Sequence, residues 1–354
     1  MRAGLTAVGC MCAAWSSMAQ PAFDPPQIVG VVNTSLLTES SGIAASRRTP
    51  GVLWTHNDSG DSARVFAIDS IGRHLGTYTL PSVTAVDFED IAVGPGPIAG
   101  VHYLYIGDIG DNLGVRANVR VHRVPEPAVN LGAWASPVSA ALADRVTITL
   151  TYPDGARDAE ALFIDPISGD LAIVTKQASG ARLYIASANA IASGGTAGLT
   201  YAGAVAFDRV TGGDISPDAA LIVLRGLDTA RVWERAAGQT MSQALSGTGV
   251  AAPVAGRPVE PQGEAIGFAH DGSGYFAISE GASPPLRFST RRFCDADVNC
   301  DGAANGVDVE VMERAIGGDL ADLCRADADF NGDGAANGLD VESVELAVGG
   351  GACP

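Results

Sequence analysis

A twelve-residue phrase occurs twice near the end of this 354-residue chain. Residues 297–308 read DVNCDGAANGVD, and residues 329–340, which lie 32 positions further on, read DFNGDGAANGLD. In both copies Asp or Asn stands at positions 1, 3, 5, 9 and 12, and Gly stands at position 6. Two copies in the same register indicate two equivalent units, each with side-chain oxygens at fixed intervals around a tight turn.

The spacing is that of an EF-hand type calcium loop, which has oxygen ligands at positions 1, 3, 5, 7, 9 and 12 and Gly at position 6. The first loop predicts calcium ligands at Asp297, Asn299, Asp301, Ala303 (through its carbonyl), Asn305 and Asp308. The second loop predicts them at Asp329, Asn331, Asp333, Ala335 (again through its carbonyl), Asn337 and Asp340. Hard oxygen donors suit Ca²⁺, and neither loop places a His or a free thiolate for zinc or copper.

A helical pattern follows each loop, VDVEVMERAIGG or LDVESVELAVGG, and ends at glycines that can stop a helix. Such paired loop–helix units with Asp at position 12 resemble the type I dockerin domain, and the resemblance covers residues 294–354. It implies a domain that folds on calcium and docks onto a cohesin-like or cell-surface protein. Family dockerins carry recognition residues at loop positions 10 and 11, where this chain has Gly306–Val307 and Gly338–Leu339 in place of the usual hydroxyl pair.

Negative charge is concentrated in the same tail. Residues 294–354 hold 14 Asp and Glu against two Arg, a net charge of −12, out of −18 for the whole chain. Phosphate binding needs a basic face, so we expect no nucleic-acid partner.

Four of the six cysteines, Cys294, Cys300, Cys324 and Cys353, also lie in the tail. An even number in a small exported region predicts two disulfides. Three pairings are open. The pairing that brackets the second repeat, Cys324 with Cys353 and therefore Cys294 with Cys300, is the one we favour from the sequence.

The first residues, MRAGLTAVGCMCAAWSSMA, have a positive start, a short apolar stretch and small residues at the end. They predict a signal peptide over residues 1–19, cut before Gln20. A buried N-terminal helix and a lipoprotein cut before Cys10 are the alternatives. No other segment reaches 18 apolar residues, so we expect no membrane span and a secreted protein, with the periplasm or the cell surface as possible locations.

Residues 20–290 show short Val, Ile, Leu and Tyr runs broken by Gly, Asp, Asn and Pro, which predicts a mainly β domain. Five similar strand starts recur at matched apolar residues, namely Ile43, Ile91, Leu162, Ile215 and Ile266. A period near 50 with three or four strands per unit predicts a β-propeller. The count favours five blades, with six blades or a β-sandwich as alternatives.

Two details of the propeller follow from the same alignment. The N-terminal QIVGVV would supply the fourth strand of the last blade and close the ring. The segment PEPAVNLGAWASPVSAALADR stretches one repeat and is expected to be irregular.

The residue two places before each matched apolar position is Glu in three repeats, Glu89, Glu160 and Glu264. The first strand of a blade lines the central channel, so these glutamates would form a ring at one mouth. With His56 of the HNDSGD turn they are the candidate catalytic residues. Clustered carboxylates could hold Ca²⁺ or Mg²⁺, or act as acid and base. The alternative is that such acids and turn residues only cap backbone amides.

The HNDSGD and GDIGDN turns, with DFEDIA between them, look like those of exported bacterial propellers related in layout to β-propeller phytases. The resemblance covers residues 38–127 and implies a propeller and phosphoester chemistry. Two functions stay open. One is a binding or scaffold module for a small molecule or glycan. The other is a secreted hydrolase of phosphoesters or polysaccharides. No GxSxG, HExxH or GxxxxGK[ST] motif occurs, which favours the first.

Overall fold

The computed structural model describes residues 22–292, 296–301, 303–325, 327–331 and 334–349. The chain divides into two compact units, of which the larger runs from Phe23 to Arg291 and the smaller contains the C-terminal residues from Arg292 on. The predicted signal peptide falls outside the described residues and stays a prediction.

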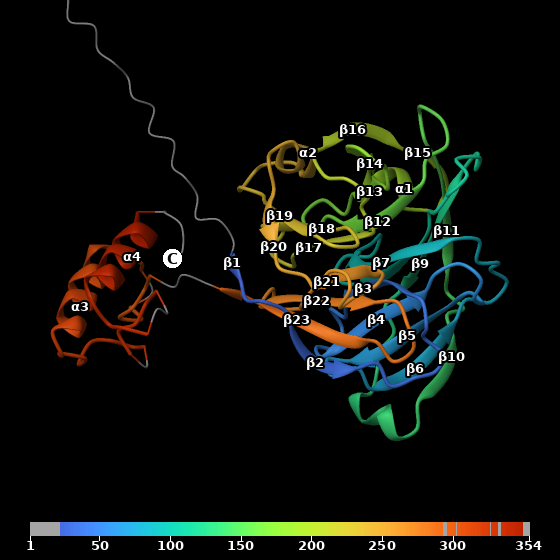
Figure 1. Ribbon diagram of the computed structural model, residues 1–354. Helices are drawn as coiled ribbons and strands as arrows, with labels where there is room; N and C mark the ends of the chain where they lie inside the picture. Colours follow the sequence, from blue (N-terminus) through green and yellow to red (C-terminus); the bar gives the residue numbers. More distant parts are fainter. Residues whose placement is uncertain (1–21, 293–295, 302, 326, 332–333, 350–354) are drawn as a thin grey trace, which may run out of the picture. The chain divides into compact units, whose positions relative to one another are not determined.

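The larger unit is a ring of five blades, whose strands are antiparallel apart from one added outer strand in each of the first two blades (Figure 1). The first blade consists of β3 (Ser40–Ala45), β4 (Val52–Asn57), β5 (Arg64–Asp69), β6 (His74–Thr79) and β10 (Val138–Ala141). The second consists of β7 (Phe88–Pro95), β8 (His102–Asp108), β9 (Val119–Pro125), β11 (Val146–Thr151) and β15 (Gly195–Gly198). The third consists of β12 (Ala159–Ile164), β13 (Leu171–Thr175), β14 (Ala181–Ala186) and β16 (Thr200–Val205). The fourth consists of β17 (Gly212–Ile215), β18 (Leu221–Arg225), β19 (Ala230–Glu234) and β20 (Val250–Ala252).

The fifth blade joins the two ends of the propeller. It consists of β21 (Gly263–Phe268), β22 (Gly274–Ser279) and β23 (Pro285–Arg292), to which β1 (Ala22–Phe23) and β2 (Gln27–Val31) add. Strand β2 pairs with β23 in antiparallel register from Gln27 opposite Phe288 to Val31 opposite Pro285. The expected ring closure by QIVGVV and the count of five blades are therefore confirmed, and neither six blades nor a sandwich describes this unit.

The segment expected to be irregular contains two regular elements. It forms the 3₁₀ helix η1 (Leu131–Ala135) and β10, which pairs with β6 of the first blade in parallel register. Strand β15 adds to the second blade in the same parallel manner, beside β11. Both additions cover the outer edge of a blade that would otherwise expose unpaired backbone groups. The sequence pattern missed β10 because its residues, VSAA, carry a weak apolar signal and are largely exposed.

The core lies between the blades. Each of five buried apolar clusters joins two neighbouring blades, and the cluster that includes Ile43, Phe66 and Ile278 joins the first blade to the fifth. The innermost strands β3, β7, β12, β17 and β21 contact one another in a closed ring (Figure 1). All residues of β3, β4, β12 and β21 are buried, because a blade packs against a neighbour on each face. This explains why the strands read as short continuous apolar runs without alternation.

Two glycines allow the inner strands to approach one another. A Cβ on Gly42 would lie 2.7 Å from the backbone nitrogen of Ile91 in the next blade. A Cβ on Gly267 would lie 2.3 Å from the backbone oxygen of Ile43 in the first blade. Neither distance is compatible with a side chain, so both contacts require glycine.

The smaller unit consists of two loop–helix pairs. Helices α3 (Gly306–Ile316) and α4 (Gly338–Val348) follow the two calcium loops and contact each other, as the helical patterns predict. Their shared core includes Val298, Met312, Phe330 and Val344. Two further short helices, α1 (Ala188–Ile191) and α2 (Met241–Leu245), belong to the propeller. In the described part of the chain, the helices are too short and too polar to span a lipid bilayer.

Candidate functional site

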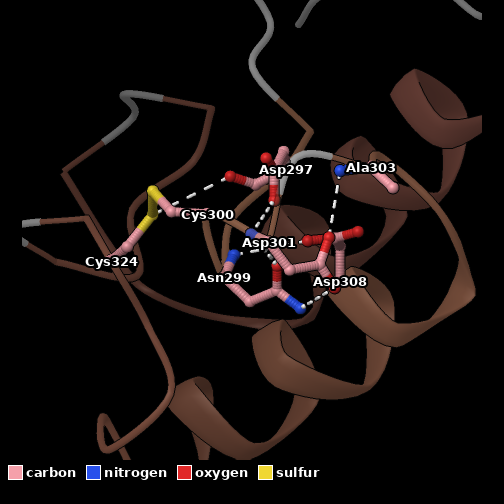
Figure 2. The surroundings of a disulfide bond; sticks show 7 residues. All are labelled: Asp297, Asn299, Cys300, Asp301, Ala303, Asp308 and Cys324. Atoms are coloured by element: carbon pink, nitrogen blue, oxygen red, sulfur yellow. Dashed lines mark hydrogen bonds between the residues drawn. A yellow bond between two sulfur atoms is a disulfide. The ribbon is translucent and has the colours of Figure 1, made fainter.

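The side chains of the first calcium loop hold its own backbone in place. The amide of Asp301 donates to the Asp297 carboxylate at 3.0 Å and to the side-chain oxygen of Asn299 at 2.9 Å. The amide of Ala303 donates to the Asp301 carboxylate at 3.0 Å. Figure 2 shows Asp297, Asn299, Asp301 and Asp308 gathered on one side of the loop. The predicted ligands of this loop are therefore close together.

The second loop has the same plan. The amide of Gly334 donates to the Asp329 carboxylate at 2.9 Å. Gly334 has a φ of +89°, in the left-handed region, and so meets the need for glycine at position 6. Of its six predicted ligands, Asp333 lies outside the described residues.

Loop positions 9 and 12 also cap the helices that follow. The Val307 amide donates to the side-chain oxygen of Asn305 at 2.9 Å, and the Asn305 amide donates to the Asp308 carboxylate at 2.8 Å. This reciprocal pair is a capping box, and Asn337 with Asp340 forms the same box at α4. The Asp that stands at position 12, where an EF-hand has Glu, therefore has a second role at the helix N-terminus.

The loops present charged oxygen donors that fit calcium. The Asp340 carboxylate accepts the backbone amides of Phe330 at 2.7 Å, Asn331 at 3.0 Å and Asn337 at 2.7 Å. Burial opposes ionisation of this carboxyl, but the amide donors prevail and lower its pKa below the ordinary value. The backbone amides thus favour the ionised carboxylate and hold it in place. No nitrogen or sulfur donor is among the predicted ligands, which agrees with a hard cation.

The disulfide of the tail differs from the pairing that we favoured from the sequence. Cys300 is bonded to Cys324, with a Cα–Cα distance of 5.9 Å, so neither Cys294–Cys300 nor Cys324–Cys353 forms (Figure 2). The chain after α3 returns along the first loop, where the Cys324 amide donates to the Val298 carbonyl at 2.9 Å. This tertiary contact, and not the bracketing of a repeat, decides the partner. Cys294 and Cys353 lie outside the described residues.

In the propeller, the three predicted glutamates occupy equivalent places. Glu89, Glu160 and Glu264 stand at the start of the innermost strands β7, β12 and β21, where the pairing register with the next strand shifts. A bulge of this kind redirects the side chain of its extra residue. All three glutamates are buried, with 6% or less of their surface exposed.

The structure brings two of these glutamates together with Asp58 of the HNDSGD turn, which the sequence offered as a metal ligand, and with Asp87 and Asp158, which it did not. The first cluster is Asp58, Asp87 and Glu89, and the second is Glu89, Asp158 and Glu160. In each cluster one oxygen of every carboxylate lies within 4.8 Å of the others. We call these five residues the mouth cluster. Neither Glu264 nor His56 belongs to either group of the mouth cluster.

The environment of the mouth cluster raises the pKa values of Glu89, Glu160 and Asp87. Burial, aided by the neighbouring Glu160 charge, raises the pKa of Glu89 well above its ordinary value. Burial raises the pKa of Glu160 to about 8 although the Lys176 ammonium pairs with it. The pKa of Asp87 rises to about 6, because of burial and the nearby Asp58 and Asp158 charges. Acidic side chains therefore lie close together in a site that is shielded from water.

Glu264 titrates near neutrality as well. It is 6% exposed, and burial raises its pKa to about 7. His56, by contrast, behaves as a buried structural residue. Its Nδ1 lies 2.9 Å from the Asn57 carbonyl oxygen, its ring packs edge-on against Phe88, and burial lowers its pKa to about 4.

Several acids of the two Asp-rich turns bind local backbone amides or arginine side chains and are not part of the mouth cluster. Asp111 accepts the amides of Val115 at 3.0 Å and Arg116 at 2.8 Å, and Asp108 pairs with Arg116 at 2.8 Å. Asp61 pairs with Arg64 at 2.8 Å. The expectation that turn acids cap local groups holds for these residues.

The two units define the class of protein. It is a five-bladed β-propeller that is followed in the sequence by a module of two calcium loops. Residues 295–348 match the family model for the Dockerin type I domain, so this part of the chain is a type I dockerin domain. No curated protein matches the chain. Among solved structures, the chain is similar to one in the crystal structure of a nidogen/laminin complex, with 10% identity and a TM-score of 0.41 over 69% of this chain and 73% of that one.

The match to the dockerin family indicates which metal binds and what kind of partner such domains have. Type I dockerin domains bind calcium, which is therefore the metal of the C-terminal unit. Dockerin domains bind cohesins, and they occur in extracellular proteins of the cellulosome type.

Proposed function

We propose that this protein is exported and attaches to a cohesin through its dockerin domain when calcium is bound. The propeller is the module that binds a ligand, and the dockerin domain attaches it to the cohesin. The observation that carries the proposal is the paired calcium loop within the dockerin match at residues 295–348. The signal-like residues 1–19 support export. The twelve loop positions given above are the proposed calcium ligands.

The proposed contact with the cohesin lies at the start of each helix. Val307 and Leu339 occupy loop position 11 of the two units, and they are 48% and 53% exposed. Exposed aliphatic side chains at matched places offer an apolar contact on each helix, where family dockerins commonly carry hydroxyl groups. We therefore infer that the partner presents an apolar surface to this site.

A pull-down with the full-length chain and a panel of type I cohesins tests this proposal. Retention is expected with calcium and is expected to be lost in EDTA. The double variant Val307→Asp/Leu339→Asp should weaken retention at least tenfold, because it places charge at both contact sites. Val259→Asp, at a propeller residue that is 63% exposed, is the matched control and should bind as the wild type does. Binding to no cohesin in calcium, with α3 and α4 folded by circular dichroism, would reject the proposal.

A second function has one specific observation in its favour. Glu264 and Glu160 titrate near pH 7 and 8 at one end of the propeller, and a general acid works best with a pKa near the working pH. This supports a secreted hydrolase of phosphoesters or polysaccharides. The test is an assay of the protein on a set of phosphoesters and a set of polysaccharides. Turnover that disappears in Glu160→Gln, while the melting temperature stays the same, would establish a hydrolase in place of a simple binding module.

A further inference from the structure

The mouth cluster has the dimensions of a cation site. Calcium binds oxygen at about 2.3–2.6 Å, so two oxygens on one ion lie no more than about 5 Å apart. The oxygens of Asp58, Asp87 and Glu89 already lie within 4.8 Å of one another, and so do those of Glu89, Asp158 and Glu160. No movement of the backbone is needed to bring either set around an ion. Glu89 belongs to both sets.

An unpartnered buried oxygen supports the same conclusion independently. Glu160 is 2% exposed, and its Oε2 is buried without a hydrogen-bond partner while its Oε1 accepts from Lys176. A buried carboxylate oxygen left without a donor is costly. A bound cation beside Glu89 and Asp158 would satisfy it.

The backbone leaves room on the other side of the cluster. A Cβ on Gly110 would lie 2.3 Å from Glu89 Oε1 and 2.5 Å from Asp87 Oδ2. Because Gly110 has no side chain, these two oxygens can meet over its Cα. Position 110 therefore favours glycine, because any larger residue would put a Cβ where these oxygens lie.

The cations near the cluster do not balance its charge. Lys176, the single lysine of the chain, pairs with Glu160. The Arg116 guanidinium is directed to the Asp108 carboxylate at 2.8 Å and to the Gly110 carbonyl at 2.6 Å. Five acids therefore share one ammonium, so the ionised form of the cluster requires further positive charge, which a divalent cation would supply.

We propose that the mouth of the propeller is a calcium site, separate from the dockerin loops, with two adjacent cation positions that share Glu89 as a bridging ligand. The ligands come from three blades. Asp58 follows β4, Asp87 precedes β7, which contains Glu89, and Asp158 precedes β12, which contains Glu160. An all-oxygen site assembled from different blades suits the irregular coordination of calcium better than the strict octahedron of magnesium. Calcium at this site would link the first three blades and so stabilise the ring.

The test measures calcium bound to the full-length chain after the dockerin loops have been disabled. Asp297→Ala/Asp329→Ala removes position 1 from both loops and leaves the propeller intact. In equilibrium dialysis against radioactive calcium, this chain is expected to retain one to two ions. Adding Glu89→Gln, which removes the shared ligand, is expected to reduce retention at least tenfold. Glu280→Gln is the matched control, since Glu280 is a half-buried acid outside the cluster, and it should change affinity less than threefold.

A second measurement covers the case in which the Glu89 variant fails to fold. Calcium should raise the melting temperature of the propeller in the loop-disabled chain by several degrees, and Glu160→Gln should remove that shift. Either of two results overturns the proposal: a folded loop-disabled chain that binds no calcium, or calcium binding that neither glutamate variant changes. Neither result affects the dockerin proposal, which depends on other residues.

Discussion

At the scale of single residues, the mouth of the propeller depends on a few acids that recur in the repeat and lie close together in space. Glu89 and Glu160 stood out because they recur at one place in the repeat. Asp87 and Asp158 lie two residues before them, in a shared D-x-E pattern. Since side chains two apart on a strand point to the same face, this pattern could have revealed both. Lys176 gave no such signal, because only the fold places it beside Glu160.

The titration of Glu264 gives a prediction about pH. Its folded pKa of about 7 lies above its ordinary value of 4.5, so the folded protein holds a proton that the unfolded chain releases. The stabilisation is complete below about pH 4.5 and is lost as the pH rises through about 7. Glu264 alone should therefore lower the free energy of unfolding by about 3 kcal/mol between pH 4.5 and 8.

Urea denaturation in EDTA across this pH range measures that effect. Glu264→Gln should flatten the decline relative to the wild type, while Glu313→Gln, at an exposed residue of α3, should leave it unchanged. Equal slopes for the wild type and Glu264→Gln would show that the two states bind this proton equally.

At the scale of elements, local patterns predicted what local interactions form. Helices α3 and α4 were expected from their periodicity and their glycine ends, and their caps come from loop residues three positions apart. Strand β10 and the disulfide partner of Cys300 were not predicted. Both depend on contacts across the fold, β10 on the edge of the first blade and Cys300 on the return of the chain past Val298.

The disulfide supports a prediction about the dockerin domain. Cys300 and Cys324 are 24 residues apart, and closing a loop of this length in the unfolded chain contributes about 3 kcal/mol. Cys300→Ser/Cys324→Ser should lower the free energy of unfolding of the tail by about that amount and weaken calcium binding to the first loop. Calcium titration followed by circular dichroism of the full-length variant measures both effects. The melting temperature of the propeller serves as the internal control and should not change.

At the scale of the whole molecule, one carboxylate ties several blades together. Asp90 on β7 is fully buried, and it accepts the amides of Ile91 and Leu162 at 2.8 Å and of Gly213 at 3.3 Å. Leu162 belongs to β12 and Gly213 to β17, so a single side chain connects the second, third and fourth blades.

Removal of this carboxylate should therefore destabilise the ring as a whole. Asp90→Ala leaves buried amides of three strands without an acceptor and should lower the free energy of unfolding of the propeller by about 3 kcal/mol. Asp90→Asn, which keeps one acceptor oxygen, should cost less. Asp271→Ala is the control, because the exposed Asp271 accepts hydrogen bonds from Ser273 within a single turn. The free energies of unfolding are measured by chemical denaturation. An equal loss in Asp90→Ala and Asp271→Ala would contradict the role of Asp90 in the ring.

Spacing along the chain is enough to specify several parts of this protein. Twelve-residue loops, the helices behind them and a repeat near 50 residues are local features, and they were enough to predict the calcium loops and a propeller of five blades. The full set of acids at the mouth and the disulfide partner of Cys300 depend instead on contacts that form only when the chain folds. Residues from different blades, such as Asp58 and Asp87, are brought together by the closure of the ring, and no interval in the sequence encodes that distance.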